Sequence, residues 1–385
     1  MNDASLIFLI LGVIYLLDCL HLVNRNAVVF SSWIGTNFKA TFAGIVVGTR
    51  SSGVMVSPLL PPLGITYIAQ PLPVSFSPTG ACSFITQALT PAGRPSQVTR
   101  VVRYDEITRL ACEGKEVLIN GDLFVKCRSP RMARHITEAI RRLVKAEPAA
   151  RERLVKQLAV ESFDVNAVRA AVESFRASAK WLRGACNLLW ILMFVVLPVL
   201  MFGLKVWFLV LPLVGLLLVL HGVVVGGYWR LHKKMMATES THRWEGLVKI
   251  VLCPPASVRA LDLISLDLLD LYHPLAVAGV VTGKSELQRL AVAMVREARH
   301  SLPVDLSVSG LAEVADWHRR TMLEAAETFL KKEQVDLSAV DQVPNRTDES
   351  VKSYCPRCLT VYMIENGDCS DCRGLALVPL KREGK

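Results

Sequence analysis

The chain has 385 residues, 52% of them hydrophobic, and its mean hydropathy of +0.37 is high for a soluble protein. Its formal net charge is +10, and it contains no Ser/His/Asp arrangement, dinucleotide-binding fingerprint or zinc-protease motif. These properties argue against a soluble enzyme of a familiar class, and the length leaves room for two or three domains besides membrane-spanning segments.

The first long apolar segment covers residues 5–23. It is long enough to cross a bilayer as a helix, so we expect transmembrane helix 1 within residues 1–23. Asp18 and His21 lie three residues apart near the end of this segment, which is typical of an interfacial helix end. A metal or proton site on that face of the helix is the alternative.

Residues 24–148 predict a β-rich domain, because short β-favouring runs alternate with turns that contain glycine, proline or serine. Asn120-Gly121 separates two such runs and predicts a two-residue hairpin. We expect strands at residues 28–33, 40–47, 54–56, 65–69, 74–76, 98–104, 107–112, 116–119 and 122–127.

A helix is expected to close this domain. Ser129 is a natural N-cap and Pro130 fits the first helical position, so the helix should run from there to about Lys145. Several antiparallel strands closed by one helix, over residues 26–145, resemble bacterial pleckstrin-homology-like modules. This resemblance implies a binding or scaffolding module rather than a catalytic one.

A charged helical segment at residues 149–184 leads into the longest apolar region of the chain. Between Ala185 and Trp229 the only charged side chain is Lys205, which predicts a transmembrane hairpin, spans 2 and 3, over residues 185–229. A buried hairpin of a soluble protein is the alternative. The apolar positions of the charged segment are expected to pack on the neighbouring domain, although pairing of two subunits, and hence a homo-oligomer, stays open.

The positive charge is concentrated between the first span and the hairpin. Residues 24–184 carry 22 Lys and Arg against 11 Asp and Glu, whereas residues 229–385 carry 21 of each kind. Basic residues stand close to the hairpin on both sides, namely Arg176, Lys180 and Arg183 before it and Arg230, Lys233 and Lys234 after it. The positive-inside rule therefore places both flanks of the hairpin in the cytoplasm. The first span then runs from outside to inside, with Asp3 outside and Arg25 inside. We expect a multi-pass protein of the inner (plasma) membrane whose basic domain contacts anionic lipid headgroups.

Residues 230–333 predict a helical cytoplasmic domain, with helices at 256–272, 285–300 and 309–332. Asp262, Asp267 and Asp270 are expected on the solvated face of the first helix, and a carboxylate site with His273 is the alternative. Residues 278–285 imitate a phosphate-binding loop, but the segment before them is a poor strand. A turn that caps an ordinary helix is the expected structure there.

A polar linker at residues 334–353 leads to two C-x-x-C pairs that are ten residues apart. Two such pairs can bring four thiolates to one tetrahedral Zn²⁺ ion, which leaves no open coordination position and makes the site structural. The pattern resembles a short zinc ribbon over residues 354–380, although Leu359 stands where such knuckles often place glycine. Two disulfides are the alternative. The expected ligands are Cys355, Cys358, Cys369 and Cys372.

These features predict an α+β membrane protein with three transmembrane helices, a β-rich domain between spans 1 and 2, and a helical cytoplasmic tail that ends in a zinc ribbon. The expected function is that of a non-catalytic adaptor or scaffold that binds membrane lipids and a protein partner. Nucleic acid is not expected as a partner, because Arg357, Lys381 and Arg382 are too few basic residues near the cysteines. A membrane enzyme or transporter component is the alternative.

Overall fold

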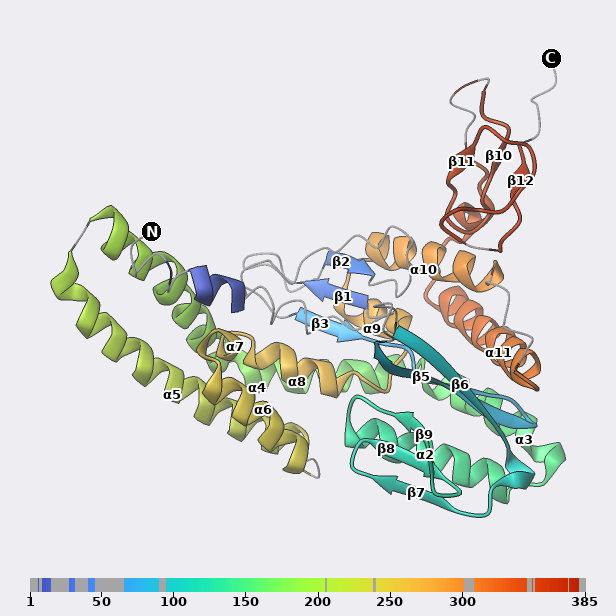
Figure 1. Ribbon diagram of the computed structural model, residues 1–385, viewed down its shortest axis with the longest axis horizontal. Coiled ribbons are helices and arrows are strands. Elements are labelled where there is room, and N and C mark those ends of the chain that lie inside the picture. Colours follow the sequence, from blue (N-terminus) through green and yellow to red (C-terminus); the bar gives the residue numbers. More distant parts are fainter. Residues whose placement is uncertain are drawn as a thin grey trace.

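The computed structural model shows an elongated molecule with a long helical hairpin at one end and a small C-terminal module at the other (Figure 1). It describes residues 6, 9–14, 28–31, 41–45, 66–89, 95–204, 206–237, 240–300, 308–344, 348, 350–372 and 374–380. In the first predicted span, residues 9–14 are helical. Apart from Leu6, the remainder of that span lies outside the described residues, including Asp18 and His21. The predicted strand 54–56 and the hairpin residue Lys205 also lie outside them.

The described strands form four antiparallel sheets of three strands each. The orders are β2-β1-β3, β4-β5-β6, β7-β8-β9 and β11-β10-β12. The first six strands are β1 (Val28–Ser31), β2 (Thr41–Ile45), β3 (Thr66–Ala69), β4 (Val74–Phe76), β5 (Gly80–Leu89) and β6 (Pro95–Arg103). The other six are β7 (Leu110–Glu113), β8 (Glu116–Ile119), β9 (Asp122–Lys126), β10 (Ser353–Tyr354), β11 (Val361–Tyr362) and β12 (Val378–Pro379).

Most of the expected strands are confirmed with small changes at their ends, but strand β5 was missed. Its first half is rich in small residues, which carry a weak strand signal. Gly80 is required there, because a Cβ atom at this position would lie 2.5 Å from the carbonyl oxygen of Val102 on β6. The long β5–β6 pair therefore depends on a close approach of two backbones that the residue pattern does not reveal.

The predicted hairpin and closing helix are confirmed. Asn120 and Gly121 take φ angles of 54° and 89°, which a two-residue turn between β8 and β9 requires. Helix α2 runs over Pro130–Lys145, and the Ser129 hydroxyl accepts a hydrogen bond from the Met132 N–H at 3.0 Å. The apolar face of α2 packs against buried residues of β4, β8 and β9 to form one hydrophobic core.

A second, larger core joins the first sheet to the helices. Val28 and Phe30 of β1 and Tyr67 of β3 belong to the same buried cluster as the helices that follow α3 (Pro148–Glu161). The strands expected within residues 24–148 thus contribute to two different cores. The remaining long helices are α4 (Val165–Ile191), α5 (Val210–Met235), α6 (Ser240–Leu252), α10 (Lys284–Arg299) and α11 (Leu311–Lys332).

The hairpin is built from α4 and its extension, followed by α5. Two π-helical turns, Leu192–Val196 and Val199–Gly203, flank Pro198, whose missing N–H interrupts the regular hydrogen-bond ladder. The segments Pro148–Gly203 and Val210–Met235 are long and apolar enough to cross a membrane, and only 22% and 17% of their most apolar windows are buried. A soluble core hairpin would be mostly buried, so these fractions disfavour that alternative.

The two hairpin helices meet closely at Gly227. A Cβ atom there would lie 2.4 Å from Cη2 of Trp181 and 2.8 Å from Cδ1 of Leu182, both on α4. We therefore expect Gly227→Ala to destabilise the protein by about 1–2 kcal/mol through overpacking, measured by thermal unfolding in detergent. Gly222→Ala is the matched control, because nothing lies within 4 Å of its Cβ position. Equal effects of the two substitutions would contradict the close approach.

The helices after the hairpin correct one expectation and confirm others. Helices α10 and α11 match the segments expected at 285–300 and 309–332. The segment expected as one helix at 256–272 forms two shorter ones, α7 (Pro254–Ser257) and α8 (Ala260–Leu268). The residues before the phosphate-loop-like segment form α9 (Pro274–Val281), a helix capped by His273, so the strand that a phosphate-binding loop needs is absent from this described segment.

Candidate metal centre

The four C-terminal cysteines converge in the small module around β10, β11 and β12. Their ligand atoms all lie within 4.8 Å of one another, although the two pairs come from separate turns of the chain. Cys355, Cys369 and Cys372 are buried, and Cys358 is half-buried. The structure therefore brings together all four residues that the sequence pattern selects.

The first cysteine knuckle forms without the expected glycine. Leu359 takes a φ angle of 62°, and its N–H donates to the Cys355 carbonyl at 2.8 Å. The Cys355 N–H donates to the carbonyl of Thr360 at 2.9 Å and closes the turn. A left-handed backbone at a leucine costs on the order of 1 kcal/mol, which the module must recover elsewhere. The departure at Leu359 thus strains the knuckle but does not prevent its geometry.

The spacing of the sulfur atoms is compatible with one bound metal ion. A Zn–S bond of about 2.3 Å places neighbouring sulfurs about 3.8 Å apart. The Sγ atoms of Cys358 and Cys369 are 3.6 Å apart, and all four cysteines are free thiols. Four thiolates would complete the coordination shell, so such an ion would hold the fold and could not present an open position to a substrate.

Polar groups around Cys369 favour its deprotonation. The Cys372 N–H donates to Cys369 Sγ at 3.1 Å, and the Tyr362 hydroxyl lies 3.1 Å from the same sulfur. Burial raises the pKa of Cys355 to about 11. Burial acts in the same direction on Cys369, but these hydrogen bonds outweigh it and lower its pKa to about 7. Hydrogen bonds to ligand sulfurs are a usual part of a thiolate site.

The module is fastened to the helical part of the molecule. Arg357, which lies inside the first knuckle, forms an ion pair with Glu297 on α10. Lys381 and Arg382 lie outside the described residues. Arg357 is therefore engaged with a carboxylate of its own chain.

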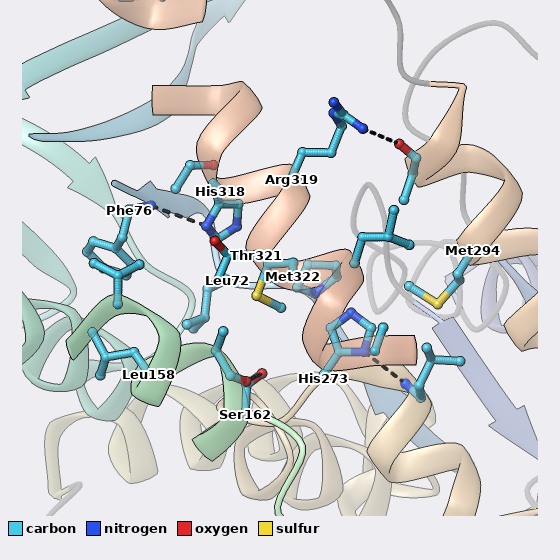
Figure 2. Close-up of a pocket in the computed structure, with 18 of the residues that line it drawn as sticks. Leu72, Phe76, Leu158, Ser162, His273, Met294, His318, Arg319, Thr321 and Met322 are labelled. Atoms are coloured by element: carbon cyan, nitrogen blue, oxygen red, sulfur yellow. Dashed lines mark hydrogen bonds between the residues drawn. The ribbon is translucent and has the colours of Figure 1, made fainter. Parts of the chain in front are cut away.

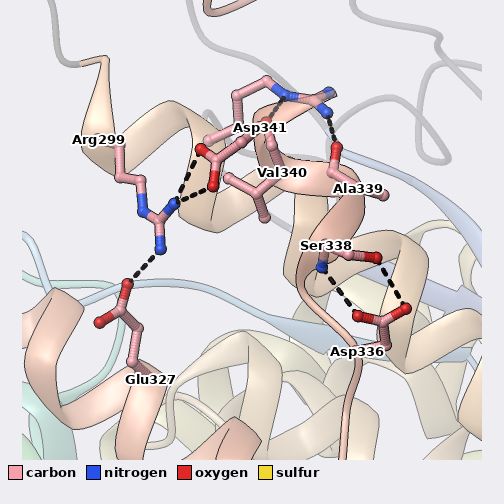
Figure 3. A network of polar contacts seen from close by, with 8 residues as sticks. Arg299, Glu327, Asp336, Ser338, Ala339, Val340 and Asp341 are labelled. Atoms are coloured by element: carbon pink, nitrogen blue, oxygen red, sulfur yellow. Dashed lines mark hydrogen bonds and ion pairs between the residues drawn. The ribbon is translucent and has the colours of Figure 1, made fainter. Parts of the chain in front are cut away.

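Part of the segment expected as a linker also lies against α10. Figure 3 shows the 3₁₀ turn Ser338–Asp341 held by polar contacts. Arg296 donates to the carbonyl of Val340 at 3.0 Å, and Arg299 contacts Asp341 at 3.0 Å and Glu327 at 2.9 Å. Val340 itself is buried in the large core. These contacts fix the base from which the cysteine module projects.

A second group of titratable residues corrects an expectation. Asp262, Asp267 and Asp270 are only 2%, 4% and 2% exposed, so their placement on a solvated helix face is wrong. The reason is that α8 packs between β3, α4 and α5, which cover its polar side as well as its apolar side. His273 does not complete a carboxylate site, because it caps α9 and its ring stacks on Phe163 at 4.3 Å.

Each of these carboxylates has a nearby partner. Arg259, the N-cap residue of α8, forms an ion pair of 3.0 Å with Asp262 in the first turn of that helix. His232 of α5 lies 4.0 Å from Asp267. The hydroxyl of Ser129, which caps α2, donates to Asp270. The group thus connects the end of the hairpin remote from its tip to the start of α2. The sequence pattern did not reveal this group. Hydrophobic periodicity identifies the apolar face of a helix, but it does not show whether other elements pack on the polar face.

No protein family, curated protein or solved structure shows significant similarity to this chain. The four-cysteine cluster is compatible with a zinc-ribbon-like site on its own geometry. The resemblance of residues 26–145 to pleckstrin-homology-like modules has no such support, and it remains a resemblance of pattern. The class that the structure defines is a mixed helix-and-sheet protein with two apolar helices able to cross a membrane and a candidate metal centre.

Proposed function

We propose that this protein is a non-catalytic membrane-anchored adaptor whose two water-facing parts lie in the cytoplasm and whose C-terminal cysteines hold a structural Zn²⁺ ion. The observation that carries the proposal is the hairpin, whose apolar side chains point outward. Phe208, Leu211 and Leu218 are 77%, 80% and 66% exposed. Exposing apolar surface of this kind to water is unfavourable in free energy, whereas lipid acyl chains can cover it.

Charges at one end of the hairpin support the proposed orientation. Arg230, Lys233 and Lys234 lie near the end of α5 that is remote from the hairpin tip. Lys180 lies in the middle of α4, two residues after Ser178. The two helices are in register there, because Lys234 donates to the Ser178 hydroxyl at 2.9 Å. We call these four residues the basic collar. Such a collar fits anionic headgroups of the cytoplasmic leaflet.

Helix α6 supports a further contact with the membrane. It packs on α5, and the rings of Trp229 and Trp244 approach to 4.8 Å. Trp244, Val248 and Leu252 are exposed on one face at helical spacing. A helix with a continuous apolar face next to a transmembrane hairpin is suited to lie in the headgroup region.

The orientation is tested with reporter fusions at Lys385 of the full-length chain. We expect a cytoplasm-dependent fluorescent reporter to be active and a periplasm-dependent phosphatase to be inactive. Replacing Lys180, Arg230 and Lys233 by Gln should increase the outward-facing fraction several-fold, because the charge bias next to the spans is removed. An active phosphatase at Lys385 in the unchanged protein would refute the proposed topology.

The matched control removes the same charge far from the hairpin. Lys126, Lys145 and Arg153 are exposed residues of β9, α2 and α3. Their replacement by Gln should leave the orientation unchanged, since charges distant from a span contribute little to its insertion. Equal effects of the two triple substitutions would show that total charge, and not the basic collar, sets the orientation.

A further inference from the structure

A cavity of about 360 Å³ lies between the β-rich core and the helical core (Figure 2). Its wall comes from the loop before β4, from α3, from the start of α9, and from α10 and α11. Most of the wall is apolar, and Leu72, Leu158, Met294 and Met322 are typical of it. A volume of this size and a wall of this kind are those of a small-molecule site.

Two histidines supply directed polar groups to this wall. Nδ1 of His318 accepts a hydrogen bond from the Phe76 N–H at 3.3 Å, and Nδ1 of His273 accepts one from the Leu275 N–H at 3.3 Å. A neutral imidazole whose Nδ1 is an acceptor carries its proton on Nε2. Both rings line the cavity, and neither Nε2 atom has a hydrogen-bond partner within the part of the chain that the structure describes. These two histidines therefore offer two imidazole N–H donors to the cavity, which His135 also lines.

Both imidazoles are neutral at physiological pH. Burial lowers the pKa of His318 to about 4 and that of His273 to about 3, and the proximity of His318 lowers the latter further. The same tautomer makes the pair unsuited to a metal ion, because an Nε2 atom that bears a proton has no lone pair to donate. The two rings can only donate hydrogen bonds into the cavity.

The cavity also presents no unpaired cationic side chain among the described residues that line it. Arg319 is the only formally charged residue among the described residues that line the cavity. Its guanidinium donates to the Ala298 carbonyl at 3.1 Å and pairs with Asp316 on the same helix. A carboxylate or phosphate entering this apolar space would lose its hydration without gaining an unpaired cation, which is strongly unfavourable.

We propose that this cavity binds an uncharged, largely apolar molecule that carries a carbonyl oxygen, such as a fatty acyl ester, and that the carbonyl accepts hydrogen bonds from the Nε2–H groups of His273 and His318. The apolar wall holds the hydrocarbon part, and the donors orient the carbonyl end. The inference is independent of the metal centre and of the orientation of the hairpin.

The test uses the full-length protein in nanodiscs and a photoreactive probe, the methyl ester of a diazirine-bearing palmitic acid. We expect crosslinks to map to α3 and α11, and methyl palmitate to compete at least 10-fold better than palmitic acid. His273→Asn keeps a side-chain acceptor for the helix cap, but its shorter side chain places no donor at the position of Nε2. It should weaken competition by methyl palmitate about 5–10-fold, the effect of one neutral hydrogen bond.

His318→Leu should weaken the competition to a similar extent, and His300→Asn, on a histidine that does not line the cavity, should leave it unchanged. If His318→Leu unfolds the protein, His273→Asn decides the matter alone, because its cap is preserved. Crosslinks confined to α4 and α5, better competition by the free acid, or wild-type affinity in His273→Asn would each overturn the proposal.

Discussion

Replacing Cys355 and Cys369 together by Ser is expected to abolish zinc binding and to unfold the C-terminal module while the remainder of the protein stays folded. The module has almost no core apart from its ligands, because three of the four buried residues in its cluster are cysteines and the fourth is Leu377. Each of its strands has only two residues. Metal binding, worth about 10–16 kcal/mol in small thiolate modules, would therefore supply most of its folding free energy.

The measurements are the zinc content of the purified protein and limited proteolysis. We expect about one zinc per chain in the unchanged protein, none in the double variant, and rapid cleavage of the variant between residues 350 and 380. Cys253→Ser is the control, because Cys253 is a half-buried free thiol outside the cluster. A metal-free wild-type protein, or a double variant whose C-terminus resists protease, would contradict a structural zinc site.

Asp270→Asn is expected to change how the stability of the protein depends on pH. Burial raises the pKa of the Asp270 carboxyl to about 7, and the hydrogen bond from Ser129 only partly opposes this. Its Oδ1 atom is buried with no hydrogen-bond partner among the described residues. The folded state thus holds a proton that the unfolded state releases near pH 4.

The sign follows from this difference. Between about pH 4 and pH 7 the folded protein binds more protons at Asp270, so the free energy of unfolding falls as the pH rises. A shift of about three pH units corresponds to about 4 kcal/mol, which is an upper value because the Asp270 charge also interacts with half-buried Arg128 and with Asp267. In Asp270→Asn this decline is absent, since the amide does not titrate.

The quantity to measure is the thermal midpoint of Asp270→Asn minus that of the wild type. We expect this difference to increase by several degrees between pH 5 and pH 8. Asp336→Asn is the control, because hydrogen bonds from Ser338 lower the pKa of that exposed carboxyl below its usual value and it stays charged in this range. A constant difference between Asp270→Asn and the wild type across this range would show that Asp270 is ionised in the folded protein at pH 5.

Features that depend on neighbouring residues could be predicted from the sequence. The cap at Ser129 and the turn at Asn120-Gly121 are set by a few backbone angles that these residue types prefer. The stretch between Ala185 and Trp229, whose only charged residue is Lys205, predicted two long apolar helices because bilayer thickness fixes the required length. The paired C-x-x-C spacing predicted the cysteine cluster because each pair closes within one turn.

Features that depend on residues far apart in the chain could not be predicted from the sequence. The buried state of Asp262, Asp267 and Asp270 follows from the packing of β3, α4 and α5 around α8, and their spacing in the sequence is equally typical of a solvated face. The Nε2–H donor of His318 is set by a hydrogen bond that its Nδ1 accepts from the N–H of Phe76, which lies 242 residues away along the chain. Neither residue carries a local signal for that contact.

The sequence by itself determined the elements whose free energy is local: the caps, the tight turn, the apolar spans and the ligand spacing. Only the tertiary structure decided which polar groups lose their contact with water, where the two cores leave a cavity, and which charges gather at the end of the hairpin remote from its tip. The physical reason is that burial is a property of all the elements that surround a side chain, and these come together only when the chain folds.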